Sequence, residues 1–277
     1  MTHQEGSFKR VHDSRIYYQA WLPETAPKAV LLIVHGLAEH SGRYMNVVNH
    51  FVPLGYAVYG FDHIGHGKSD GPRVYVERFQ DFLDTIKIYY DLIRTWQPGK
   101  PVFLIGHSMG GLITAVYLLD HQADFAGAIL SGASVKIPDH ISSATIIAGK
   151  MFSKLLPKFG LLKLEADWVS RDLAVVQAYV NDPLVCTGKI SARLAGELLE
   201  ATRRISAEAE KITLPILILH GGADKLVESD GSQMFYDRIR STDKTLKIYP
   251  GLYHEVFNEP ERERVLMDVE GWVGKNA

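Results

Sequence analysis

The chain has 277 residues, of which 46% are hydrophobic and 22% charged, and its formal net charge is −2. These proportions fit a globular protein with a large core, and the balanced charge argues against nucleic acid as a partner. The single cysteine, Cys186, excludes an intrachain disulfide, fits a reducing compartment, and is interpreted as a buried structural thiol. The N-terminus has neither region of a signal peptide and the longest apolar runs are of strand length, so we expect a cytoplasmic protein.

The first third of the chain alternates between strand and helix patterns. Two short runs on either side of Asp13 predict an antiparallel hairpin at a sheet edge. The continuous β-branched run from Ala29 to Val34 must be buried on both faces, as in a parallel sheet. The predicted elements are the hairpin strands 7–12 and 15–21, strands 29–34 and 55–61, and helices 44–54 and 79–96.

A pentapeptide of the form G-x-S-x-G, Gly106–Gly110, follows the apolar run 101–105 and leads into the apolar segment 111–118. Strand, sharp turn and helix in this order are typical of a nucleophile elbow, in which a strained turn lifts the serine hydroxyl above the sheet. Glycine suits the flanking positions because a side chain there would collide with the neighbouring strand and helix. The pattern predicts Ser108 as a catalytic nucleophile.

The second half of the chain contains a long interval without a strand pattern. From about Pro138 to about Ile205 the sequence is helical in character, whereas strands are predicted on both sides of it. We expect a mostly parallel, doubly wound α/β sheet, with 1–136 and 206–277 as its core. The interval 137–205 is too long for a loop and is interpreted as a helical cap over the carboxyl ends of the strands. The remaining predicted elements are strands 126–131, 214–219 and 245–249 and a helix over 262–273.

A serine nucleophile needs a base and an orienting acid, which follow it in the order acid, then histidine, on this type of sheet. His254 lies five residues beyond the last strand pattern, and Asp224 directly follows the run ending at Leu219. Asp62 precedes the serine among turn residues, so it is expected to brace its loop. Glu255 is expected to point away from the histidine, as a solvated or structural residue.

The oxyanion of the reaction needs two backbone donors. Met109, the residue after the nucleophile, supplies one N–H, and the loop after the strand at 29–34 supplies the other, which we assign to Leu37. His35 and His107 flank glycines on buried turns and are interpreted as structural histidines. The chain has no metal-binding spacing of histidines or cysteines and no nucleotide-binding glycine motif, so neither metal nor cofactor is expected.

The segment His35–Tyr44 resembles the H-G-x-x-E-H-S-x-R-Y stretch of the monoacylglycerol lipase family, within the serine aminopeptidase S33 and lysophospholipase-like α/β hydrolases. Residues 61–71, the elbow, 181–185 and 243–254 are similar to the same family. The resemblance implies the α/β-hydrolase fold, with Ser108, Asp224 and His254 as the triad. It implies a serine esterase that cleaves monoacylglycerols to fatty acid and glycerol through an acyl-enzyme.

Several alternatives stay open. A lysophospholipase, a general carboxylesterase or a cofactor-free perhydrolase would use the same triad, and a non-catalytic receptor would retain the pocket. A dehalogenase or epoxide hydrolase would need a carboxylate where Ser108 stands.

The cap carries a dense apolar cluster at helical spacing, interrupted by lysines. Either this face is buried over the core and walls an acyl pocket, or part of it is exposed and adsorbs to a membrane, where the lysines would meet anionic head groups. The sequence does not decide between these two, nor does it set the oligomeric state. The apolar residues are Ile146, Ile147, Met151, Phe152, Leu155, Leu156, Phe159, Leu161, Leu162 and Leu164, and the lysines are Lys150, Lys154, Lys158 and Lys163.

Overall fold

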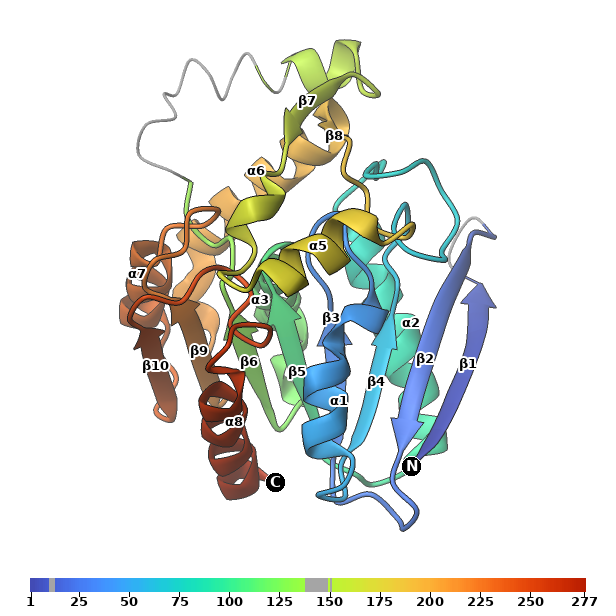
Figure 1. Cartoon of the computed structure of the whole chain (residues 1–277), viewed down its shortest axis with the longest axis vertical. Coiled ribbons are helices and arrows are strands. Elements are labelled where there is room, and N and C mark those ends of the chain that lie inside the picture. Colours follow the sequence, from blue (N-terminus) through green and yellow to red (C-terminus); the bar gives the residue numbers. More distant parts are fainter. Residues whose placement is uncertain (10–12, 138–148, 150) are drawn as a thin grey trace.

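The computed structural model describes residues 1–9, 13–137, 149 and 151–277. Their centre is an eight-stranded sheet in the order β1-β2-β4-β3-β5-β6-β9-β10, in which only β2 runs against the other strands. Figure 1 shows the sheet with helices on both faces. The strands are β1 (Thr2–Lys9), β2 (Arg15–Leu22), β3 (Val30–Val34), β4 (Ala57–Phe61), β5 (Val102–His107), β6 (Gly127–Ser131), β9 (Ile216–Gly221) and β10 (Lys244–Tyr249).

The core forms two layers because successive side chains of a strand point to opposite faces of the sheet. In β3, Val30, Leu32 and Val34 join one apolar cluster, whereas Leu31 and Ile33 join the other. The first cluster is covered by α2 (Gln80–Trp96), α3 (Met109–His121), α6 (Ala192–Glu208) and α7 (Asp230–Arg238), and the second by α1 (Met45–Phe51) and α8 (Arg262–Asn276). The α/β-hydrolase fold predicted from the sequence is confirmed.

Most predicted elements lie within a few residues of the observed ones. The edge hairpin is present as β1 and β2, although β1 begins at Thr2, and α2 matches the predicted helix closely. The helix α7 between β9 and β10 was not predicted. Short 3₁₀ turns complete the chain at η1 (Ser41–Tyr44), η2 (Gln122–Asp124), η3 (Ala166–Trp168) and η4 (Ala209–Lys211).

The expectation of a strand-free cap is wrong. Segment 137–205 contains the short antiparallel pair β7 (Gly160–Lys163) and β8 (Lys189–Ser191), besides α5 (Leu173–Asn181) and most of α6. The pair was missed because three- and four-residue strands are too short to give a period-2 pattern. In Figure 1, α5 lies across the upper end of the sheet and β7 and β8 rise above it. Pro138, Ile146, Ile147 and Lys150 lie outside the described residues.

Candidate active site

Ser108 occupies the turn between β5 and α3 with φ 53° and ψ −117°, a backbone conformation that L-residues rarely adopt. Such strain persists only where the surroundings impose it, and here close packing does so. A Cβ on Gly106 would lie 2.4 Å from Oγ1 of Thr114, so only glycine lets the strand and helix approach this closely. The turn therefore has the geometry of the nucleophile elbow predicted from the sequence.

His254 and Asp224 are brought together from two different loops. Asp224 follows β9 and His254 follows β10, and Nδ1 of His254 lies 2.6 Å from Oδ2 of Asp224. The other carboxylate oxygen, Oδ1, accepts N–H groups from Leu226 at 2.8 Å and Val227 at 3.0 Å. These bonds hold the carboxylate in one orientation, as an acid that orients an imidazole requires.

The two groups shift each other's pKa in the directions that favour an ion pair. Burial opposes the charged imidazolium, but the Asp224 carboxylate outweighs it and raises the pKa of His254 above the usual 6.5. Burial likewise opposes the charged carboxylate, yet His254 and His220 keep the pKa of Asp224 below its usual value. The pair is therefore preset to accept a proton on the imidazole while the carboxylate stays ionised.

His220 is a contact of Asp224 that the sequence analysis did not single out. Its Nε2 lies 3.1 Å from Oδ2 of Asp224, its Nδ1 lies 2.7 Å from the hydroxyl of Ser232, and its side chain is fully buried. The sequence feature that could have indicated this contact is the place of His220 at the end of the β9 strand pattern, four residues before the predicted acid. This second partner further restricts the carboxylate.

The backbone N–H groups of Leu37 and Met109, which both lie at the pocket, have no hydrogen-bond acceptor among the described residues. Met109 is the first residue of α3, so its N–H has no partner within the helix. Leu37 lies in the loop after β3, and both residues line the same pocket as Ser108. Unpaired donors beside the serine suit an oxyanion, and the role of Leu37 and Met109 as its donors stays a prediction.

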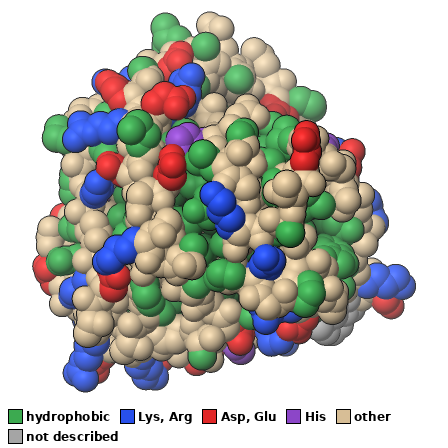
Figure 2. All heavy atoms as spheres, turned by 90° about the horizontal axis from the view of Figure 1, so that it is seen from below, with side chains coloured by type: hydrophobic (Ala, Val, Ile, Leu, Met, Phe, Trp, Pro, Cys, Tyr) green, Lys and Arg blue, Asp and Glu red, His purple; other side chains and the backbone are tan. Residues whose placement is uncertain are grey.

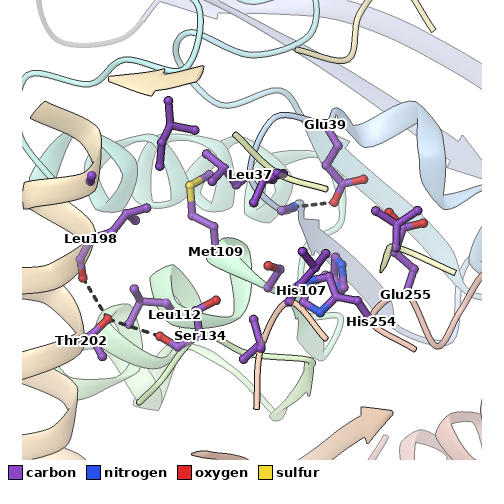
Figure 3. Close-up of a pocket in the computed structure, with 18 of the residues that line it drawn as sticks. Leu37, Glu39, His107, Met109, Leu112, Ser134, Leu198, Thr202, His254 and Glu255 are labelled. Atoms are coloured by element: carbon purple, nitrogen blue, oxygen red, sulfur yellow. Dashed lines mark hydrogen bonds between the residues drawn. The ribbon is translucent and has the colours of Figure 1, made fainter. Parts of the chain in front are cut away.

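One pocket collects Ser108, His254, Leu37 and Met109. It is a partly open hollow of about 290 Å³ with mainly apolar walls. Figure 3 shows Leu198 and Thr202 of α6 at the side of the pocket opposite His254, with Leu112 and Met109 of α3 between them. The apolar wall contains Leu112, Leu164, Ile190, Leu198, Leu199 and Val227.

The structure bears on the sequence interpretations of two further acidic residues, Asp62 and Glu255. Asp62 braces its loop as expected, because Oδ1 accepts the Ser41 N–H at 2.9 Å and Oδ2 accepts the Lys68 N–H at 2.8 Å. Glu255 is not solvated: it is 5% exposed and ion-paired with Arg43. The solvated alternative for Glu255 is therefore wrong, and the structural one holds.

The surroundings of the buried histidines near the site favour the neutral form of the imidazole. His35 and His107 are buried, and burial lowers the pKa of both, that of His107 to about 4. They match the structural role predicted for them. Cys186 differs from the prediction, since its side chain is half-buried instead of buried.

The apolar cluster of the cap is divided between two environments. Leu164 lines the pocket, whereas Met151, Leu155, Leu156, Phe159 and Leu161 are exposed by 37% to 73%. One part of the cluster is therefore buried at the pocket and another part is exposed, whereas adsorption to a membrane stays a prediction. Figure 2 views the molecule from the end opposite the cap, where basic and acidic side chains are interspersed.

The described residues contain no group of three or more histidine, cysteine, aspartate or glutamate side chains placed to hold a metal ion. Among the same residues, no helix is long and apolar enough to span a bilayer.

Comparison with known proteins points to one family. The family model described as serine aminopeptidase, S33, matches residues 25–261. A monoacylglycerol lipase of Mycolicibacterium smegmatis is 40% identical over 98% of this chain and 97% of its own length, and human monoglyceride lipase is 35% identical over 95% and 88%. Among solved structures, the monoacylglycerol lipase of Paleococcus ferrophilus has a TM-score of 0.83 at 28% identity, with both chains fully covered.

Proposed function

This chain belongs to the monoacylglycerol lipase group of the serine aminopeptidase S33 family, and on that premise we propose that it hydrolyses monoacylglycerols to a fatty acid and glycerol. The observation that carries the proposal is the pocket, where an apolar wall begins beside Ser108 and extends to Leu198 on α6. Such a wall holds an acyl chain and leaves the ester carbonyl at the serine.

The reaction follows from the groups around the serine. His254 takes the proton of the Ser108 hydroxyl as its oxygen attacks the ester carbonyl, and Asp224 stabilises the imidazolium that forms. The Leu37 and Met109 N–H groups bind the oxyanion of the tetrahedral intermediate. The proton then passes from His254 to the departing glycerol oxygen, and a water molecule deacylates the serine by the same steps.

The pocket size favours a single acyl chain. A volume of about 290 Å³ lies at the lower end of the range for small-molecule sites, and each buried methylene contributes up to about 0.8 kcal/mol. The experiment that tests this function compares the rates at which the purified protein hydrolyses monoolein and diolein. Monoolein should be hydrolysed faster, and Ser108→Ala should abolish both hydrolysis and labelling by a fluorophosphonate probe.

Two results would reject this proposal in different ways. Hydrolysis of diolein as fast as monoolein would reject a single-chain site. A wild-type protein that labels with the probe but hydrolyses no monoacylglycerol would point instead to a lysophospholipase or general carboxylesterase, which lysophosphatidylcholine and p-nitrophenyl butyrate would identify.

The protein also contacts membranes through a cap patch, defined as Met151, Leu155, Leu156, Phe159 and Leu161. Within a single stretch of the cap, these side chains are between 37% and 73% exposed, which is the feature of a surface that enters a lipid interface. The interspersed Lys154, Lys158 and Lys163 are exposed and have no ion-pair partner among the described residues. Anionic head groups would neutralise these lysines.

Vesicle binding tests this contact. Leu155→Glu should weaken binding to vesicles, because Leu155 is 73% exposed in the cap patch. Vesicles that contain anionic lipid should bind the wild type more tightly than zwitterionic vesicles. Met267→Glu is the matched control, because Met267 is 65% exposed on α8, outside the cap patch. Equal binding by the two variants would remove the cap from the membrane contact.

A further inference from the structure

Arg43 lies at the centre of a buried ion network that joins two loops of the site. Its Nη1 lies 2.9 Å from Oε2 of Glu39 and 2.6 Å from Oε1 of Glu255, and its Nη2 lies 2.7 Å from Oε2 of Glu255. The three side chains are at most 10% exposed. A guanidinium that binds one carboxylate with two parallel bonds fixes direction as well as distance.

Glu39 extends this network to the oxyanion loop, 35–39. Its second oxygen, Oε1, accepts the N–H of Gly36 at 2.7 Å and the hydroxyl of Tyr44 at 2.8 Å. Gly36 immediately precedes Leu37, so this bond sets the orientation of the backbone that carries the Leu37 N–H. Figure 3 shows the Glu39 side chain turned toward this loop beside Leu37. A Cβ on Gly36 would lie 2.8 Å from the same oxygen, so the carboxylate fills that space.

Glu255 extends the network to the loop of the general base. It follows His254 directly, its N–H donates to the Val169 carbonyl at 2.8 Å, and its Oε2 accepts the Asn258 amide at 2.8 Å. Backbone and side chain of this residue are therefore both fixed. Because His254 is its neighbour in the chain, the position of the imidazole depends on the same contacts.

We propose that Glu39, Arg43 and Glu255 are positioning residues that hold the oxyanion loop and the His254 loop at a fixed separation. The inference rests on the proposed function, because it concerns the geometry of that reaction. Misplacing reacting groups by about 1 Å costs about 10²-fold in rate, so a rigid connection between the donor and the base is valuable. Stability alone is a poor reason for three buried charges, since apolar replacements of such groups often stabilise a fold.

The network also acts on the imidazole electrostatically. The charged and titratable groups facing His254 are Asp224, Glu255, Glu39, His107 and, through the two glutamates, Arg43. The two glutamates carry one more charge than the single guanidinium neutralises. Their excess negative charge favours the imidazolium that forms in the transition state.

The test separates position from charge with two variants. Glu255→Gln removes both a bond acceptor and the charge, so kcat should fall about 10-fold to 10²-fold with KM unchanged, and the acid limb of the pH profile should move to lower pH. Arg43→Lys keeps the cation but loses the fork, so kcat should fall while the acid limb does not move to lower pH. A Glu255→Gln enzyme with wild-type kcat and an unmoved acid limb would overturn the proposal.

A control and a second readout complete the experiment. Asp81→Asn removes another buried carboxylate that pairs with an arginine, Arg78, at the start of α2, so it should lower stability and leave kcat unchanged. If Glu255→Gln does not fold, Arg43→Lys carries the test. The rate of fluorophosphonate labelling is measured in all variants, because it needs the serine, the base and the oxyanion donors but no particular ester. If the wild type hydrolyses no monoacylglycerol, the proposed function fails, whereas slower labelling of the variants still supports the positioning role.

Discussion

Gly110 of the elbow packs directly against the carbonyl of Val34: a Cβ at position 110 would lie 2.0 Å from that oxygen. The contact joins the first turn of α3 to the end of β3, one residue before the oxyanion loop begins. It shows how two segments more than 70 residues apart are set at the distance that places Ser108 beside Leu37.

Gly110→Ala should therefore destabilise the protein by several kcal/mol or displace the elbow, since neither backbone can yield cheaply. Urea unfolding and fluorophosphonate labelling measure the two effects. Gly271→Ala is the control, because a Cβ at that position of α8 meets nothing within 4 Å. That control should be neutral or stabilising by up to about 1 kcal/mol, as expected when a helical glycine is replaced by alanine. Wild-type stability and labelling in Gly110→Ala would contradict the packing described here.

Asp224→Asn should lower kcat about 10⁴-fold while the fold is retained. The amide would still fill the site, but it would favour the wrong tautomer of His254 and would not stabilise the imidazolium. Steady-state hydrolysis of p-nitrophenyl butyrate measures the effect. Asp237→Asn, an aspartate on α7 that bonds only Gln233 at 2.9 Å among the described residues, should behave as the wild type. A loss of less than about 10-fold in Asp224→Asn would remove this residue from the triad.

The acid limb of kcat/KM should lie above pH 6.5. A general base acts only when unprotonated, and Asp224 raises the pKa of His254 above 6.5 despite burial, so activity falls as the pH drops through that raised value. The pH profile of kcat/KM is measured with a short ester, and the rate of its uncatalysed hydrolysis is subtracted at each pH. A limb well below pH 6.5 would contradict the His254–Asp224 geometry.

Stability should fall as the pH drops from 6.5 toward 4. Burial lowers the pKa of His66 to about 3 and that of His107 to about 4, so the native state keeps both neutral while the unfolded chain takes up protons below 6.5. Each group then removes up to about 1.4 kcal/mol of unfolding free energy per pH unit. Urea unfolding at pH 7, 6 and 5 should show this slope, and His66→Gln should reduce it by about one such increment. An unchanged slope in His66→Gln would contradict the neutral assignment.

Leu198→Trp should shift the preferred substrate to shorter acyl chains. Leu198 lies on the wall opposite His254, so a larger side chain there occupies space that the acyl chain would fill (Figure 3). Each methylene that no longer fits loses about 0.8 kcal/mol, or about 4-fold in kcat/KM. A chain-length series of monoacylglycerols measures the shift. Leu173→Trp, at a position 74% exposed on α5, is the control. An unchanged series in Leu198→Trp would place the acyl chain elsewhere.

The sequence alone determined the sheet and the elbow. Continuous apolar runs such as 30–34 identify strands buried on both faces, because no other environment accepts them. The glycines around Ser108 identify a turn that only close packing of strand and helix requires. Chain order then placed Asp224 and His254 after the correct strands. The strand patterns and the elbow are local features, because the residues that define each of them are neighbours in the chain.

Only the tertiary structure decided which side chains meet across loops. Glu255 and Arg43 are 212 residues apart and neither belongs to a periodic pattern, so no feature of the sequence indicates that their charges pair in a buried site. The same holds for the division of the cap cluster between the pocket wall and the exposed cap patch. Burial of a charged or apolar side chain depends on what the rest of the chain places beside it, and spacing along one segment does not contain that information.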